Sequence, residues 1–162
     1  MQKSNDIMTA RSEVGMHHAL SYTDNLSAKT SDTILLIGRI MLGLIFVRSG
    51  YGKLFDMSAY ATILQGRGIP VFLAYIAVAA EFFGGIALIL GFATRYVVLV
   101  MIVFMIVATL TSHRYWQFTD ANVRRIQDSS FYKNLAMTGG FCFLFICGSG
   151  RFSVDAWLRR RS

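Results

Sequence analysis

One apolar run constrains this chain more than any other feature, and it carries a single acid. Residues 69–92, IPVFLAYIAVAAEFFGGIALILGF, contain Glu81 near the middle and no other charge. A transmembrane helix needs about 20 consecutive apolar residues, so the run is long enough to cross a bilayer. An ionisable side chain at that depth costs a few kcal/mol on insertion scales. We therefore predict that Glu81 faces other protein and has a polar or charged partner there.

Three further apolar runs extend this pattern to four membrane spans. They cover about residues 33–50, 96–113 and 133–150. The chain is 54% hydrophobic and 15% charged, whereas a soluble domain carries about 25% charged residues. Because the apolar residues are blocked into long runs, the sequence predicts an all-α integral membrane four-helix bundle, with a transmembrane domain over residues 31–155.

The segments outside the spans are polar or amphipathic. We expect residues 1–30 to form a mostly disordered polar tail, and residues 156–162 to form a basic C-terminal tail. Within residues 51–68 apolar side chains recur at helical spacing, which predicts a short amphipathic helix at the membrane surface between the first two spans. Ser31 and Asp32 offer an N-cap for the first span.

The net charge of +7 is better explained by membrane lipid than by nucleic acid. Basic residues lie mainly in tails and loops, where the positive-inside rule places them, and no nucleic-acid motif is present. An even number of spans puts both termini on one side. The excess of basic residues there is slight, but the run Arg159–Arg161 favours termini in the cytoplasm.

Arg39 is the expected counter-ion of Glu81. It shares a helix face with Gly43 and Gly50, and Glu81 shares one with Gly85. Glycines let two helices approach closely, so the two charged faces should meet along them. The alternative for Arg39 is snorkelling to the membrane interface.

Lys53 is the rival partner of Glu81, if the amphipathic segment dips into the bundle. When the ionisable and amide residues are placed by their expected depth in the membrane, they form a polar column that extends into the bundle from the side opposite the termini. A buried carboxylate beside cations can exchange protons, and cations with an amide can orient a carbonyl or anionic group. Candidate catalytic residues are Glu81 and Arg39, and candidate ligand-binding residues are Lys53, Glu81, His113, Asn134 and Arg48. The alternatives are an ion pair that only fixes helix register and, for His113, an aromatic-belt position at the interface.

Aromatic residues near this column suggest a flat, apolar ligand such as a quinone head group. These flanking residues are Phe46, Tyr51, Phe55, Phe82 and Phe83.

Two cysteines, Cys142 and Cys147, lie five apart and form no Cys-x-x-Cys pair, so we expect them to be small core residues. The sequence predicts no metal site and leaves catalysis open.

Four stretches, in order along the chain, resemble the DoxX family of small bacterial membrane proteins. The likeness extends over about residues 34–155. A further stretch, SHRYWQFTDANV, is similar to an inner-membrane branch of that family. The four stretches are IGRIMLGLIFVRSGYGKL, GRGIP, AAEFFGGIALILGFATR and FYKNLAMTGGF.

The resemblance implies a multi-pass protein of the bacterial inner membrane. For some members it also implies redox chemistry, as a quinone-linked thiosulfate-oxidising subunit or as an anchor for oxidative-stress enzymes. The resulting hypothesis is a membrane subunit that handles a quinone or similar molecule together with a soluble redox partner. The alternatives are a non-catalytic anchor or assembly partner, and a small-solute carrier, which would need a homo-oligomer. The residues that the family pattern highlights are Arg39, Lys53, Glu81, Gly91, Arg95 and Asn134.

Overall fold

The chain is a set of packed helices, as the sequence predicts. The computed structural model describes the backbone of residues 2–161 and the side chains of residues 24–27 and 29–161. Its elements are α1 (Gln2–Phe55), α2 (Met57–Gln65), α3 (Val71–Leu90), α4 (Thr94–Ser112), the 3-10 helix η1 (Tyr115–Gln117), α5 (Ala121–Cys147) and α6 (Val154–Arg159). The all-α prediction is therefore confirmed.

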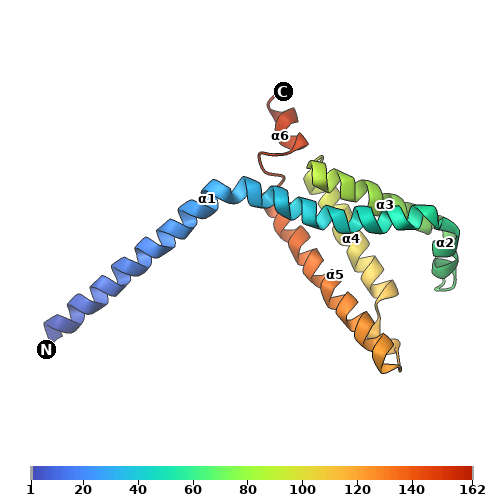
Figure 1. The fold of residues 1–162 in the computed structure, drawn as a ribbon, viewed down its shortest axis with the longest axis horizontal. Coiled ribbons are helices and arrows are strands. Elements are labelled where there is room, and N and C mark those ends of the chain that lie inside the picture. Colours follow the sequence, from blue (N-terminus) through green and yellow to red (C-terminus); the bar gives the residue numbers. More distant parts are fainter. Residues whose placement is uncertain (1, 162) are drawn as a thin grey trace.

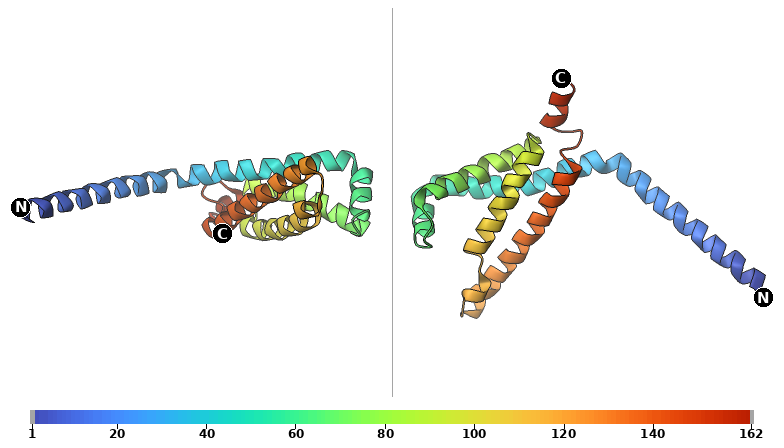
Figure 2. Two further views of the ribbon diagram at one scale, coloured as in Figure 1. Left: turned by 90° about the horizontal axis from the view of Figure 1, so that it is seen from below. Right: turned by 180° about the vertical axis from the view of Figure 1, so that it is seen from behind.

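The helices pack as two antiparallel pairs, which Figures 1 and 2 show from three sides. The second half of α1 lies along α3, and α4 lies along α5. We call the end of the bundle formed by residues 32, 91–95 and 148–155 the terminal end. We call the opposite end, formed by residues 53–70 and 112–133, the loop end. The short helix α2 lies at the loop end, where the sequence predicts an amphipathic segment.

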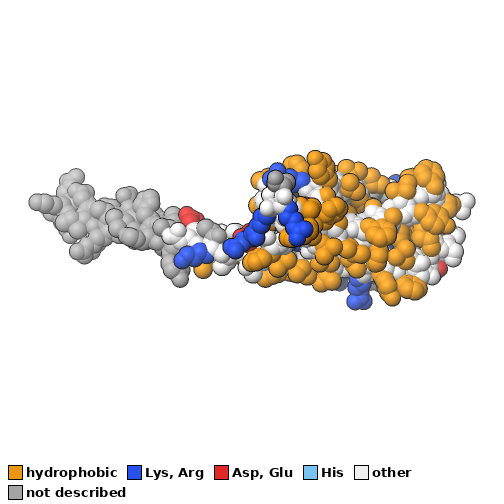
Figure 3. Space-filling model, turned by 90° about the horizontal axis from the view of Figure 1, so that it is seen from above, with side chains coloured by type: hydrophobic (Ala, Val, Ile, Leu, Met, Phe, Trp, Pro, Cys, Tyr) orange, Lys and Arg blue, Asp and Glu red, His pale blue; other side chains and the backbone are white. Residues whose placement is uncertain are grey.

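Three segments of the described residues are long and apolar enough to cross a membrane. They are Lys29–Phe55, Val71–Leu90 and Thr94–Gln117. The predicted fourth span, residues 133–150, includes Lys133 and Asn134 and does not reach the same hydropathy. Large apolar side chains cover the outside of the bundle, so the embedded helices contact lipid (Figure 3).

Small residues bring α1 and α3 into backbone contact. A Cβ atom added at Gly43 would lie 2.7 Å from the backbone oxygen of Gly85, and one added at Gly85 would lie 2.9 Å from that of Gly43. A Cβ atom added at Gly50 would lie 2.8 Å from the backbone nitrogen of Phe82. The two glycine-bearing faces therefore meet, as their spacing predicts.

Helix α1 does not begin at the predicted cap. It is continuous through residues 31–32, and the carboxylate of Asp32 accepts a hydrogen bond from the backbone N–H of Arg151 at 2.8 Å. The cap prediction is wrong because no helix begins at this point, and the carboxylate is left to bond a segment far along the chain. The helix continues back to Gln2, and Figure 1 shows that part leading away from the packed helices. The prediction of a disordered tail stays a prediction.

The core lies between the two helix pairs. Phe46, Met101 and Phe141 are at most 3% exposed and belong to one buried cluster. Cys142 and Cys147, in contrast, are exposed on α5. The prediction that they are core residues is therefore wrong. The inward face of α5 carries Phe141, and the two cysteines lie on other faces of the helix.

Candidate functional site

Glu81 pairs with Lys53 and not with Arg39. The carboxylate is buried, and the ammonium Nζ of Lys53 lies 2.7 Å from its Oε1 and 2.6 Å from its Oε2. The hydroxyl of Ser49 lies 3.4 Å from Oε2 as a further donor. Both oxygens of the carboxylate are thus held by one cation, and the predicted Arg39–Glu81 pair is wrong.

The register of α1 against α3 explains this pairing. The two helices are antiparallel, with Gly50 opposite Phe82 and Gly43 opposite Gly85. A residue nearer the start of α1 therefore lies nearer the end of α3. Arg39 reaches Gly91, ten residues beyond Glu81, which is about 15 Å along a helix.

Arg39 is fully buried at the terminal end. Its Nη2 donates a hydrogen bond to the backbone oxygen of Phe152, and its Nη1 lies where Gly91 leaves room. A Cβ atom at Gly91 would overlap that Nη1, and the positive φ of 66° also favours glycine there. Arg39 therefore points inward, as predicted, but it holds the C-terminal segment instead of joining the polar column.

A polar cavity of about 390 Å³ lies at the loop end, and the Lys53–Glu81 pair forms part of its wall. His113 and Asn134 also line it. Residues from α1, α3, the end of α4 and α5 thus surround one space. Four of the five predicted ligand-binding residues are brought together in this way.

The polar side chains opposite the ion pair are held in place by neighbours. The amide Nδ2 of Asn134 donates to the Oγ1 of Thr109 at 3.0 Å, and both residues are buried. The Nδ1 of His113 is 2.8 Å from the Oε1 of Gln127. These contacts orient an amide and an imidazole toward the cavity that they line.

Arg48 does not line this cavity. It is exposed, because the five residues that separate it from Lys53 turn it about 140° away around α1. Among the aromatic residues predicted to flank the ligand, Phe46 lines the cavity. Tyr51, Phe55 and Phe83 lie mostly exposed on the outer surface.

Sequence reasoning missed several polar residues of the cavity wall. Tyr60 of α2 lies beside the ion pair, with the Nζ of Lys53 4.8 Å from the centre of its ring. Burial, and then the negative charge of Glu81, raise the pKa of Tyr60, so its phenol keeps its proton. Arg67 donates to the Oγ of Ser112 at 2.6 Å, which joins α4 to the segment after α2. Of these residues, Ser49 could have been predicted from the sequence, because it lies one turn before Lys53 on the same face of the helix.

A second, apolar cavity of about 350 Å³ adjoins the polar one. It lies between α2, α3 and α4, and Ile76 and Val103 in its wall are more than half exposed on the membrane-facing surface. The combined space thus has a polar inner part and an apolar part open toward lipid. Residues that line both cavities are Tyr60, Phe104, Ala108 and Ser112.

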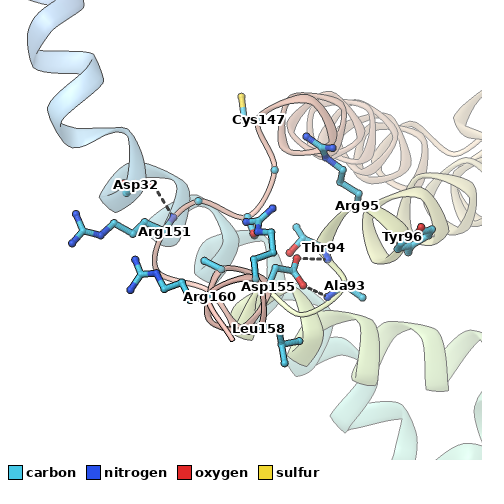
Figure 4. Close-up of a pocket in the computed structure, with 15 residues that line it drawn as sticks. Asp32, Ala93, Thr94, Arg95, Tyr96, Cys147, Arg151, Asp155, Leu158 and Arg160 are labelled. Atoms are coloured by element: carbon cyan, nitrogen blue, oxygen red, sulfur yellow. Dashed lines mark hydrogen bonds between the residues drawn. The ribbon is translucent and has the colours of Figure 1, made fainter. Parts of the chain in front are cut away.

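A separate polar cluster fastens α6 to the terminal end (Figure 4). The carboxylate of Asp155 accepts hydrogen bonds from the backbone N–H groups of Ala93 at 2.7 Å and Thr94 at 2.9 Å. Ala93 has a positive φ of 46° and no side-chain cap of its own. Asp155 therefore caps α4 from 62 residues away, while its own N–H donates to the oxygen of Gly91 at 3.0 Å.

We expect this cap to make stability depend on pH. Burial raises the pKa of Asp155, but hydrogen bonds from Thr94 and Ala93 and the charge of Arg159 outweigh it, so the net pKa is lowered. A carboxyl whose pKa is lowered by folding stabilises the fold when ionised. That contribution is present above its ordinary pKa of 3.8 and is lost as the pH falls through the folded value.

The variant Asp155→Asn should therefore lose about 1–2 kcal/mol near neutral pH, where an ionised acceptor is removed. Its melting temperature in detergent should also fall less than that of the parent as the medium is acidified. Asp24→Asn, on an exposed part of α1, is the matched control and should follow the parent. If both variants follow the parent at every pH, the cap does not contribute to stability.

Comparisons with known proteins match most of this chain. A protein-family model described as DoxX matches residues 34–114. The inner membrane protein YqjF of Escherichia coli (strain K12) is 29% identical over 133 residues, which is 82% of this chain and 98% of that protein. The inner membrane protein YphA of the same organism is 33% identical over 140 residues, or 85% of this chain and 98% of that protein.

A third relative matches only part of the chain. The putative oxidoreductase CatD of Bacillus subtilis (strain 168) is 34% identical over 79 residues, which is 49% of this chain and 58% of that protein. No solved structure matches the chain. The likeness to inner membrane proteins agrees with the apolar helices that the structure shows.

Proposed function

This chain belongs to the DoxX family and is a multi-pass protein of the bacterial inner membrane, and from this premise we propose that it is a membrane subunit of a redox system that binds a quinone or a similar molecule. One observation carries the proposal. The buried carboxylate of Glu81 pairs with the partly exposed ammonium of Lys53, and this pair lines a polar cavity whose neighbour is apolar and open to lipid. A membrane-soluble ligand with a polar head and an apolar body fits that combination.

The dimensions and lining of the two cavities support a ligand of this class. Small-molecule sites commonly measure about 300–1,000 Å³ and are mostly apolar with a few convergent polar groups. The polar cavity, at about 390 Å³, falls in that range and accommodates a head group. The apolar cavity, lined by side chains such as Leu73 and Val100, receives the body or tail of the molecule.

The polar groups have the chemistry that a quinone head needs. Reduction of a quinone to a hydroquinone adds two electrons and two protons to the two carbonyl oxygens. Lys53 with Glu81 supplies one proton, and His113 on the other wall supplies the second. Asn134 donates a hydrogen bond that orients a carbonyl. A soluble redox protein supplies the electrons, and the partial likeness to CatD, a putative oxidoreductase, supports a redox role.

A binding titration tests the proposal. A short-chain quinone is titrated into protein in mild detergent, and binding heat is measured for the parent, for Asn134→Leu and for Arg48→Gln. Asn134→Leu should bind about tenfold more weakly, since one hydrogen bond in a low-dielectric site is lost. Arg48→Gln should bind like the parent, because that side chain lies outside the cavity. Equal affinities for all three proteins would place the quinone elsewhere.

We further propose that both termini face the cytoplasm. The terminal end carries Arg151 and the run Arg159–Arg161, and the positive-inside rule favours such a group on the cytoplasmic side. A fusion of alkaline phosphatase to the C-terminus should be inactive, because that enzyme needs the periplasm to form its disulfides. An active fusion would reverse the orientation.

A further inference from the structure

A third cavity lies at the terminal end, far from the Lys53–Glu81 pair. This cavity measures about 740 Å³, and its wall is formed by the start of α4, the end of α5 and the C-terminal segment. Four arginines and two carboxylates line it. The basic residues are Arg95, Arg151, Arg159 and Arg160.

The two carboxylates are already committed to backbone groups. Asp32 accepts from the N–H of Arg151, and Asp155 accepts from the N–H groups of Ala93 and Thr94 (Figure 4). The charge of Arg159 also acts on Asp155. The wall therefore keeps an excess of positive charge, and Figure 4 shows Arg151 and Arg160 extending away from the Asp155 cap.

The edge of this cavity lies at the level of a membrane interface. Tyr96 is 77% exposed and Trp157 is 50% exposed, and amphipathic rings of this kind gather where lipid headgroups lie. The guanidinium carbon of Arg161 lies 3.9 Å from the centre of the Trp157 ring. Figure 3 shows the basic side chains gathered around the C-terminal end, where the hydrophobic surface of the bundle begins.

Apolar side chains continue from the cavity toward the bilayer. Ile146, one residue before Cys147 in the wall, is 73% exposed, and its backbone oxygen lies 3.5 Å from the Nη2 of Arg95. An anion held by Arg95 would thus have an apolar surface directly beside it. A free phosphate ion gains no free energy from contact with an apolar surface, whereas the acyl chains of a phospholipid are stabilised by packing against it.

We infer that this cavity binds the phosphate of an anionic phospholipid headgroup at Arg95, with the acyl chains against the end of α5, while Arg151 and Arg160, which extend along the other side of the cavity, add positive charge that attracts the anionic lipid. Arginine suits phosphate because its planar fork of N–H donors matches two phosphate oxygens at once. The bound lipid would fasten α6 and the end of α5 to one leaflet. This site is independent of the quinone proposal, since the two cavities share no residue.

Native mass spectrometry of the full chain tests the inference. Delipidated protein in detergent is mixed with equal amounts of phosphatidylglycerol and phosphatidylcholine, and the bound species are counted. The parent should retain phosphatidylglycerol preferentially, and Arg151→Gln/Arg160→Gln should reduce that preference by about tenfold or more, because each basic residue near a membrane surface contributes to anionic lipid binding. Arg124→Gln/Arg125→Gln removes two exposed charges from the loop end and should keep the parent preference.

Each other outcome overturns the inference. An equal loss in the Arg124/Arg125 control would mean that net charge alone retains the lipid. An unchanged preference in Arg151→Gln/Arg160→Gln would mean that these two residues do not attract the lipid. Displacement of phosphatidylglycerol by inorganic phosphate would make the site one for a free anion. If the double variant does not fold, the single variants Arg151→Gln and Arg160→Gln carry the same comparison.

Discussion

Replacing Lys53 with methionine is expected to destabilise the protein by about 3–5 kcal/mol near neutral pH, because the carboxylate of Glu81 would stay buried without its cation. That carboxylate has both oxygens within 2.7 Å of the Lys53 ammonium. In Lys53→Met/Glu81→Gln no unpaired charge remains, so much of the loss should be recovered. The free energy of unfolding in detergent, measured for the parent, the two single variants and the double variant, gives the coupling.

A second double-mutant cycle, on Arg39→Met and Glu81→Gln, is the control, because Arg39 on α1 reaches Gly91, ten residues beyond Glu81. Its losses should add. Additive losses for Lys53 and Glu81, with coupling between Arg39 and Glu81, would contradict the register that the structure shows.

Replacing Gly85 with alanine should be about as damaging, with an expected loss of about 3 kcal/mol. The added Cβ would lie 2.9 Å from three atoms, two of them backbone atoms of Gly43 and Val47. Backbone atoms cannot rotate away, so α1 and α3 would have to separate. That separation would also pull Lys53 from Glu81, and the variant should therefore bind quinone more weakly than its loss of stability alone explains.

Gly139→Ala is the matched control for Gly85→Ala. A Cβ atom at Gly139 meets nothing within 4 Å, and alanine is the better helix former by about 0.5–1 kcal/mol. The same chemical change is thus expected to stabilise α5 and to destabilise the α1–α3 pair. Thermal unfolding in detergent measures both. Equal melting temperatures for the two variants would show that α1 and α3 are not in backbone contact.

The apolar runs alone predict the helices well, because hydrophobic length is set by the membrane and not by packing. The predicted spans 33–50, 69–92 and 96–113 fall within the described segments that can cross a membrane or extend only slightly past them. The faces of α1 and α3 were also predictable, since glycines mark where helices can approach. The second half of α5 is apolar enough to predict, but its polar first half lowers its hydropathy.

The partner of Glu81 was not predictable, because a glycine stripe defines a face and leaves the register along it open. Arg39 and Lys53 lie on faces of α1 that both suit a buried carboxylate, and only the pairing of Gly50 with Phe82 decides between them. The roles of Arg39 and Asp155 could not be predicted from the sequence for another reason. Their partners are backbone groups of Phe152, Ala93 and Thr94, which no side-chain pattern reveals.

One measurement tests the central claim most directly: mass spectrometry of small molecules extracted from protein purified in mild detergent, with Glu81→Gln purified in parallel. A quinone bound between Lys53, Glu81 and Asn134 should be retained by the parent and lost from the variant. The thermal stability of each sample shows whether the variant is folded. A folded parent that retains no quinone, or a variant that retains as much as the parent, would contradict the claim and leave the Lys53–Glu81 pair as a packing element of a membrane anchor.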